Sequence, residues 1–127
     1  MSLDDGAYRV LSPLKTDHGH FRVTQHPTND PCVCDSGGQS LYIEHTSGDK
    51  YTIQYLKGDE NFLGPSDTIT MDNTVRYRPG AFEWTIESVG PGQFRVCILD
   101  QDMYWQIPNN PGNETKVVLL YCYQHIR

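Results

Sequence analysis

Paired cysteines and histidines are the residues of this chain whose types and spacing come nearest to metal chemistry. Cys32 and Cys34 are separated by one residue, and His18 and His20 flank a glycine. Zinc needs four ligands at tetrahedral reach, and the sequence offers neither pair a C-x-x-C or H-x-x-x-H partner. We therefore expect two half-buried thiols and a surface turn, and no metal site.

Catalytic motifs are missing from the sequence as well. Asp59, Asp100 and Asp102 lie beside predicted tight turns, where a structural role accounts for them. The chain has no nucleophile elbow, P-loop or dinucleotide fingerprint. We expect no catalytic residue and no cofactor, and therefore a protein that is not an enzyme.

One loop is the strongest candidate for a binding site. It consists of Gln25, His26, Pro27, Thr28, Asn29, Asp30 and Pro31. Two prolines restrict φ on either side of a polar tip, and Asn and Asp favour local side-chain turns. A stiff, projecting loop loses little entropy when it enters a cleft. We expect this loop to bind a partner, while an ordinary irregular connection would carry the same turn residues.

The segments that must position this loop repeat at a shift of about 43 residues. The aligned sets are Tyr8, Tyr51 and Phe94; Leu41 and Trp84; Ile43 and Ile86; and Phe62 and Trp105. A propeller needs about four or more blades, whereas three units of this length favour a β-trefoil. In that fold six hairpin strands close a short barrel and six more cap it. Tyr8, Tyr51 and Phe94 should then occupy matching barrel positions.

Turn residues interrupt the chain at short intervals, and no window keeps the apolar period of a helix. We predict a single all-β domain over residues 1–127 with twelve strands. They are Ala7–Leu11, His20–Thr24, Cys32–Cys34, Ser40–His45, Lys50–Leu56, Glu60–Leu63, Thr68–Met71, Phe82–Glu87, Gln93–Leu99, Met103–Ile107, Lys116–Leu120 and Tyr121–Ile126. The longest irregular segments, Gln25–Pro31 and Asp72–Gly80, are predicted loops.

Two hairpin turns and the closure of the barrel follow from the same repeat. Thr46–Asp49 and Val89–Gly92 occupy equivalent hairpins, and glycine supplies positive φ in each. Tyr121–Ile126 must pair beside the first strand if the barrel is to have no open edge.

Composition and charge narrow the classes of partner. The formal net charge is −6 and the ten Lys and Arg are scattered, which disfavours binding to a phosphate backbone. No apolar run is long enough to cross a membrane, and the first residues do not resemble a signal peptide. We expect a cytoplasmic protein, or one exported by an unconventional route. Its four cysteines should be reduced, with a Cys97–Cys122 bridge as the open alternative.

Several motifs resemble those of a known family. Met1–Val10 is similar to the "M-S-L-x-x-G-x-Y-x-hydrophobic" start of small β-trefoil protease inhibitors from mushrooms. Phe82–Ile86 and Gly92–Val96 resemble the W-x-I and G-x-Y/F-x-I/V pair of that group. This mycocypin-like group includes the clitocypins, the macrocypins and related serine protease inhibitors. The short acidic chain looks closest to the cocaprins.

The resemblance implies a reversible inhibitor of papain-like cysteine proteases and pepsin-like aspartic proteases, active in fungal defence. In cocaprins the loop between the second and third strands contacts cysteine proteases, and it corresponds here to Gln25–Pro31. Such a loop would occlude the active-site cleft. The aspartic-protease site lies elsewhere on cocaprins and has no assignable residues here. The family is described as dimeric, and the sequence neither supports nor opposes a homodimer.

Two other classes of function stay open from the sequence. Mushroom β-trefoil lectins share much of the same core, so carbohydrate binding is the alternative. The Gln-x-Trp motif of ricin-type lectins is missing, because Gln106 follows Trp105 instead of preceding it by two residues. A structural or storage protein is the third class.

Overall fold

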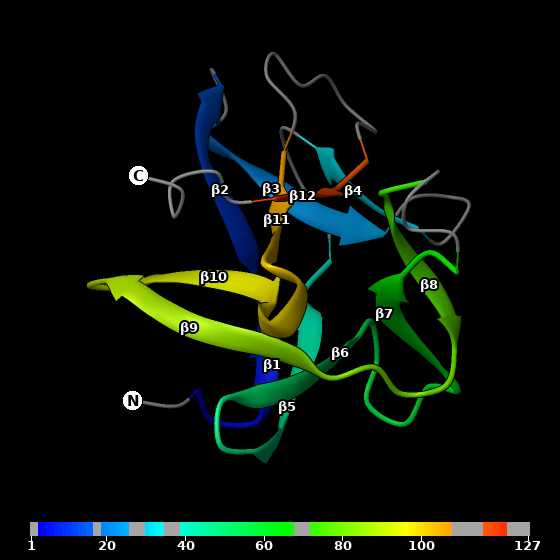
Figure 1. The fold of residues 1–127 in the computed structure, drawn as a ribbon. Coiled ribbons are helices and arrows are strands. Elements are labelled where there is room, and N and C mark those ends of the chain that lie inside the picture. Colours follow the sequence, from blue (N-terminus) through cyan, green and yellow to red (C-terminus); the bar gives the residue numbers. More distant parts are fainter. Residues whose placement is uncertain are drawn as a thin grey trace.

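The structure, a computed structural model, describes residues 3–16, 19–25, 30–34, 39–67, 72–107 and 116–121. These residues form an all-β fold with one short 3-10 turn, η1 (Leu99–Gln101), and no α-helix (Figure 1). The strands are β1 (Gly6–Tyr8), β2 (Val10–Thr16), β3 (Gly19–Gln25), β4 (Pro31–Cys34), β5 (Leu41–Ser47), β6 (Lys50–Gln54), β7 (Asn61–Pro65), β8 (Val75–Pro79), β9 (Trp84–Gly90), β10 (Gln93–Ile98), β11 (Met103–Gln106) and β12 (Val118–Tyr121).

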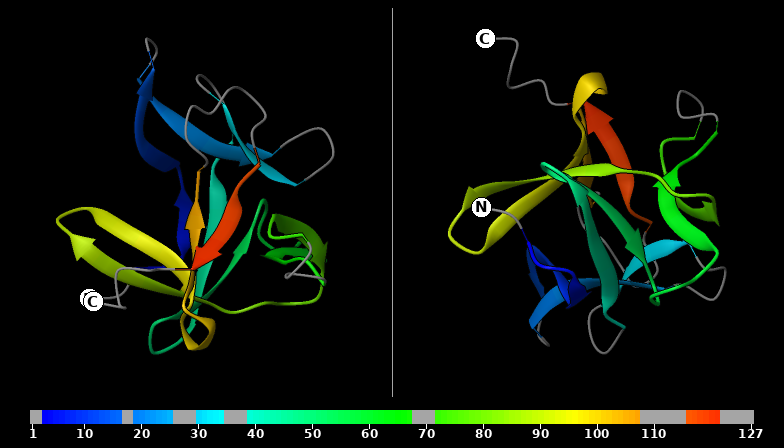
Figure 2. Two further views of the ribbon diagram at one scale, coloured as in Figure 1. Left: turned by 45° about the horizontal axis from the view of Figure 1, so that its top comes forward. Right: turned by 90° about the horizontal axis from the view of Figure 1, so that it is seen from below.

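The strands belong to three sheets. The largest has the order β1-β5-β6-β9-β10-β11-β12, a second has β2-β3-β4, and the third is the β7–β8 hairpin. Figure 2 shows the β2–β3, β7–β8 and β9–β10 hairpins extending in three directions from the middle of the molecule. In the described part of the chain, no helix has the length and apolar character needed to span a bilayer.

The two predicted glycine turns are confirmed. Gly48 connects β5 to β6 with φ 53°, and Gly92 connects β9 to β10 with φ 68°. A residue with a Cβ is disfavoured in this left-handed region, which explains why glycine stands at both turns. The two hairpins therefore share the same kind of turn, with a glycine at positive φ.

Core positions in the first pairs of the repeat match closely. Leu41 and Trp84 are both fully buried, and Ile43 and Ile86 are almost so. All four belong to one apolar cluster that also contains Tyr51. The Trp84 indole N–H donates to the Leu63 carbonyl at 2.9 Å, which satisfies the polar atom of the largest buried side chain.

One pair of aligned positions differs in burial. Tyr51 is only 1% exposed, whereas Phe94 is 40% exposed. Tyr51 lies between the paired residues His45 of β5 and Trp84 of β9. Phe94 pairs with Ser88 of β9, and the described part of β11 reaches β10 at Cys97 and Ile98. The two aligned residues therefore differ in burial, because the described chain places a strand on both sides of Tyr51 and on one side of Phe94.

Two strand predictions need correction. The predicted strand Ala7–Leu11 is divided at Arg9, because β1 pairs with β5 while β2 turns away to pair with β3. The predicted loop Asp72–Gly80 contains β8, whose Val75 is fully buried. Alternation of apolar and charged residues makes this segment suitable for a half-buried strand.

Some predictions lie outside the described residues. These include the strand Thr68–Met71, all of Tyr121–Ile126 beyond Tyr121, and Cys122 with its alternative bridge to Cys97. Tyr121 itself belongs to β12.

Candidate functional site

The predicted binding loop joins β3 to β4. The last residue pair of this hairpin is Gln25 with Pro31, so the loop leaves and re-enters the sheet at a paired position. Asp30 and Pro31 are both buried. Residues 26–29, which include His26, Pro27, Thr28 and Asn29, lie outside the described residues.

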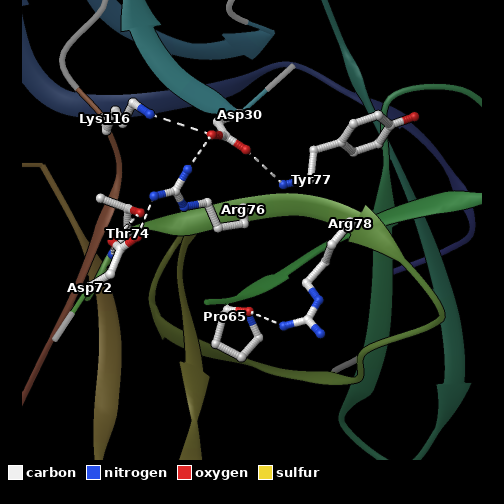
Figure 3. Close-up of polar contacts among 8 residues, drawn as sticks. All are labelled: Asp30, Pro65, Asp72, Thr74, Arg76, Tyr77, Arg78 and Lys116. Carbon is white, nitrogen blue, oxygen red and sulfur yellow. Dashed lines mark hydrogen bonds and ion pairs between the residues drawn. The ribbon is translucent and has the colours of Figure 1, made fainter. Parts of the chain in front are cut away.

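Asp30 anchors the second end of the loop through its carboxylate (Figure 3). Its side chain is only 12% exposed. Oδ2 accepts from Arg76 Nη1 at 2.9 Å and from Lys116 Nζ at 3.4 Å, and Oδ1 accepts from the backbone N–H of Tyr77 at 3.1 Å. A buried carboxylate is costly unless it is paired and hydrogen-bonded, and here both conditions are met.

Arg76 connects this carboxylate to a second one. Its other terminal nitrogen, Nη2, pairs with Asp72 Oδ2. The second oxygen of Asp72 accepts from the Thr74 hydroxyl at 2.6 Å and from the Thr74 backbone N–H at 3.1 Å. The bonds from Thr74 and the guanidinium lower the pKa of Asp72 to about 2. The hydrogen bond to Asp72 likewise raises the pKa of Arg76 above its usual value.

Backbone contacts join the same three segments. The Val117 N–H donates to the Pro31 carbonyl at 3.4 Å, and the Val75 N–H donates to the Val117 carbonyl at 2.9 Å. The Leu119 N–H donates to the Asn73 carbonyl at 2.7 Å. Three chain segments that are distant in sequence thus meet at the base of the loop, and Asp30, Arg76, Asp72 and Lys116 form a charged cluster there. We call these four residues the base cluster.

The rest of β8 holds the strand that carries Arg76. The Tyr77 hydroxyl donates to Asp59 Oδ2 at 2.6 Å, and its ring packs on Tyr55 at 4.7 Å between centroids. Burial and the bond to Asp59 raise the pKa of Tyr77 to about 12. Arg78 donates to the Pro65 carbonyl of β7 at 2.8 Å (Figure 3). It also pairs with the exposed Asp67.

The contacts of the base cluster suit a structural role, which is to hold the chain segments at the base of the loop together, and not a catalytic role. Each of its cations contacts a carboxylate. The lowered pKa of Asp72 makes that carboxylate a weak base. Among the described residues no three His, Cys, Asp or Glu side chains are grouped as a metal site. Cys97 donates its thiol hydrogen to the Thr85 carbonyl at 3.5 Å, and burial raises its pKa to about 11. A thiol with that pKa is a poor nucleophile.

Sequence reasoning identified Asp30 but missed its partners. Arg76 and Asp72 fell in a predicted loop, and Lys116 was assigned to a strand without any role. The alternation Val75-Arg76-Tyr77-Arg78 was the available signal for β8. Nothing in the sequence pairs Asp30 with a cation 46 residues away.

The sequence matches no protein-family model, and a search of curated proteins returns no significant match.

Proposed function

We propose that this protein is a reversible inhibitor of papain-like cysteine proteases, with pepsin-like aspartic proteases as a second target class. The observation that carries the proposal is the anchored base of the Gln25–Pro31 loop. Asp30 is held by two cations and a backbone N–H, and Pro31 is buried. A loop with fixed ends loses less entropy when it wedges into a cleft, which favours binding from a small area.

The scaffold that we propose for this loop is a β-trefoil with pseudo-three-fold symmetry. Val33, Val75 and Val117 recur at intervals of 42 residues, one in each proposed repeat. All three are fully buried and belong to the same apolar cluster. A three-fold axis would place equivalent side chains around one centre, so this spacing supports the symmetry.

Strand pairing supports a sixth barrel strand at the end of the chain. In the first proposed repeat β5 returns to pair with β1, and in the second β9 returns to pair with β6. The third repeat begins with β10, and its returning strand would be the segment after β12, Cys122–Ile126. That strand would occupy the edge of β10 beside Phe94.

Deleting residues 122–127 tests the proposed closure. Loss of a barrel strand should lower the melting temperature by about 10 °C or more, equivalent to a few kcal/mol for a domain of this size. A control that removes only Arg127 should melt as the full chain does. If the chain that ends at Tyr121 melts within about 2 °C of the full chain, the sixth strand is wrong.

Inhibition assays with papain and pepsin test the function directly. Replacing Pro27, Thr28 and Asn29 by glycines should raise the inhibition constant for papain, because glycine removes the restriction that Pro27 places on φ. Pepsin inhibition should persist if its contact surface is separate. Glycine at the exposed Leu56 and Lys57 is the matched control in another loop, and it should leave papain inhibition unchanged.

Two outcomes would reject the proposal in different ways. Equal papain inhibition by the parent and the triple-glycine variant would remove the loop assignment. Absence of inhibition of either protease, together with binding on a glycan array, would favour a lectin. Trp105 offers little support for sugar stacking, because its ring packs edge-on against Trp84 at 5.4 Å and its indole nitrogen is buried.

A further inference from the structure

The base cluster contains two kinds of cation that play different geometric parts. Arg76 directs one terminal nitrogen to Asp30 and the other to Asp72. Lys116 approaches the same Asp30 oxygen at 3.4 Å. A guanidinium is planar and its donors lie in a fixed fork, whereas an ammonium is a rotatable point charge. Arg76 therefore constrains the direction of the Asp30 carboxylate, and Lys116 supplies charge.

Resting on the proposed function, we propose that Arg76 is a positioning residue for protease inhibition, which sets the position of the Asp30–Pro31 end of the binding loop through the Asp30 carboxylate. Arg76 bridges the end of that loop to the Asp72–Thr74 turn, whose own bonds fix the position of Asp72. The Asp30 end of the loop is thereby connected to the Asp72–Thr74 turn. Its effect on a protease is transmitted through Asp30 and needs no contact between Arg76 and the target.

The remaining contacts explain why the fold should tolerate a change at Arg76. Without the guanidinium, Asp30 keeps the Lys116 ammonium and the Tyr77 N–H, so its carboxylate stays compensated. The backbone bond from Val117 to Pro31 also stays in place. A change at Arg76 should therefore alter the direction of the Asp30 carboxylate without unfolding the protein.

Arg78 provides a matched control on the same strand. The side chains of Arg76 and Arg78 are 38% and 37% exposed. Arg76 pairs with two aspartates and Arg78 with one. The partners of Arg78, Asp67 and the Pro65 carbonyl, belong to the β7 side of the hairpin and not to the loop. Arg76→Lys and Arg78→Lys therefore make the same chemical change, but only Arg76 contacts the loop.

The experiment compares both variants with the parent for papain inhibition and thermal stability. Arg76→Lys should raise the inhibition constant about tenfold, mostly through faster dissociation, and Arg78→Lys should change it less than about twofold. Melting temperatures of the two variants should agree. The inference is overturned if Arg76→Lys inhibits as the parent does, or if both variants lose inhibition and stability to the same extent.

Amide hydrogen exchange separates this inference from the proposed function. If the parent does not inhibit papain, the proposed function fails, and exchange then decides the positioning role alone. Arg76→Lys should speed exchange in peptides that contain Gln25 and Cys32, while Arg78→Lys should not. Equal exchange in these peptides for both variants would show that Arg76 does not hold the Asp30–Pro31 end of the loop in place.

Discussion

The β5–β6 and β9–β10 hairpins have equivalent sequences, but their aligned aromatic residues differ in burial. Both turn through a positive-φ glycine, and their aligned residues Leu41 and Trp84 are fully buried. Yet Tyr51 of β6 is buried and Phe94 of β10 is exposed. The difference lies in neighbours and not in side-chain chemistry, because both residues are large aromatics in strands.

Tyr51 has partners on every side. It pairs with His45 and with Trp84, and its hydroxyl accepts from the Leu3 N–H at 2.8 Å. Along Phe94 the described chain supplies β9 on one side. A repeat in sequence therefore specifies the shape of a hairpin, while burial depends on which strand comes to lie beside it.

Replacing Tyr51 by alanine should cause the largest loss of stability among the changes that test this comparison. The change removes a fully enclosed ring and leaves a cavity, which should cost about 3–5 kcal/mol of unfolding free energy. Urea denaturation of parent and variant measures the difference. Tyr51→Phe is the control, since it keeps the ring and loses only the hydroxyl bond to Leu3. A cost near 1 kcal/mol for Tyr51→Ala would contradict the burial described.

Replacing Phe94 by alanine should cost less, about 1–2 kcal/mol, because part of the ring already contacts water. The same urea titration measures it. Combining Phe94→Ala with deletion of residues 122–127 sharpens the result. If the last segment packs beside β10, the two changes share partners and their costs will not add. Additive costs would mean that the segment does not reach Phe94.

Replacing Gly48 or Gly92 by alanine should have similar, smaller effects in the two hairpins. A Cβ at either position meets no heavy atom within 4 Å, so the cost is conformational. Each change should lower stability by about 1 kcal/mol. Thermal or urea unfolding of both variants checks this value. A large difference between them would show that the turns, and not only the neighbours, distinguish the hairpins.

Thiol labelling of Cys97 should show that exposure is confined to the Phe94 end of β10. Cys97 is fully buried, and burial raises its pKa from 9.0 to about 11. The thiolate should therefore be about 100-fold scarcer than in the unfolded chain, with native labelling at pH 8 slower by at least that factor. Peptide mass spectrometry with and without denaturant measures both rates. Equal rates would indicate that all of β10 opens.

The sequence was sufficient for the local features of this fold. Gly48 and Gly92 indicated their turns, because few residues other than glycine adopt a positive φ. Leu41 and Trp84 were aligned by the repeat, and both are in the core. Local turn chemistry and apolar spacing act over a few residues, so a single sequence reveals them.

Contacts between distant segments could not be predicted from the sequence. The partners of Asp30 lie 46 and 86 residues further along the chain, and any of the ten Lys and Arg could have faced it. The burial of Phe94 could not be predicted for the same reason, since it depends on a neighbouring strand. The β8 strand is different, because its alternating pattern was present and was assigned to a loop.

The packing of Trp84 on Trp105 has a spectroscopic consequence. These are the two tryptophans of the chain, and their rings meet edge to face at 5.4 Å and 85°. Intrinsic fluorescence therefore originates in the core and not in the Gln25–Pro31 loop. Close aromatic pairs also couple their electronic transitions, so circular dichroism should carry a signal specific to this pair. A variant whose emission and dichroism match the parent has kept its core, and any lost inhibition can then be assigned to the loop.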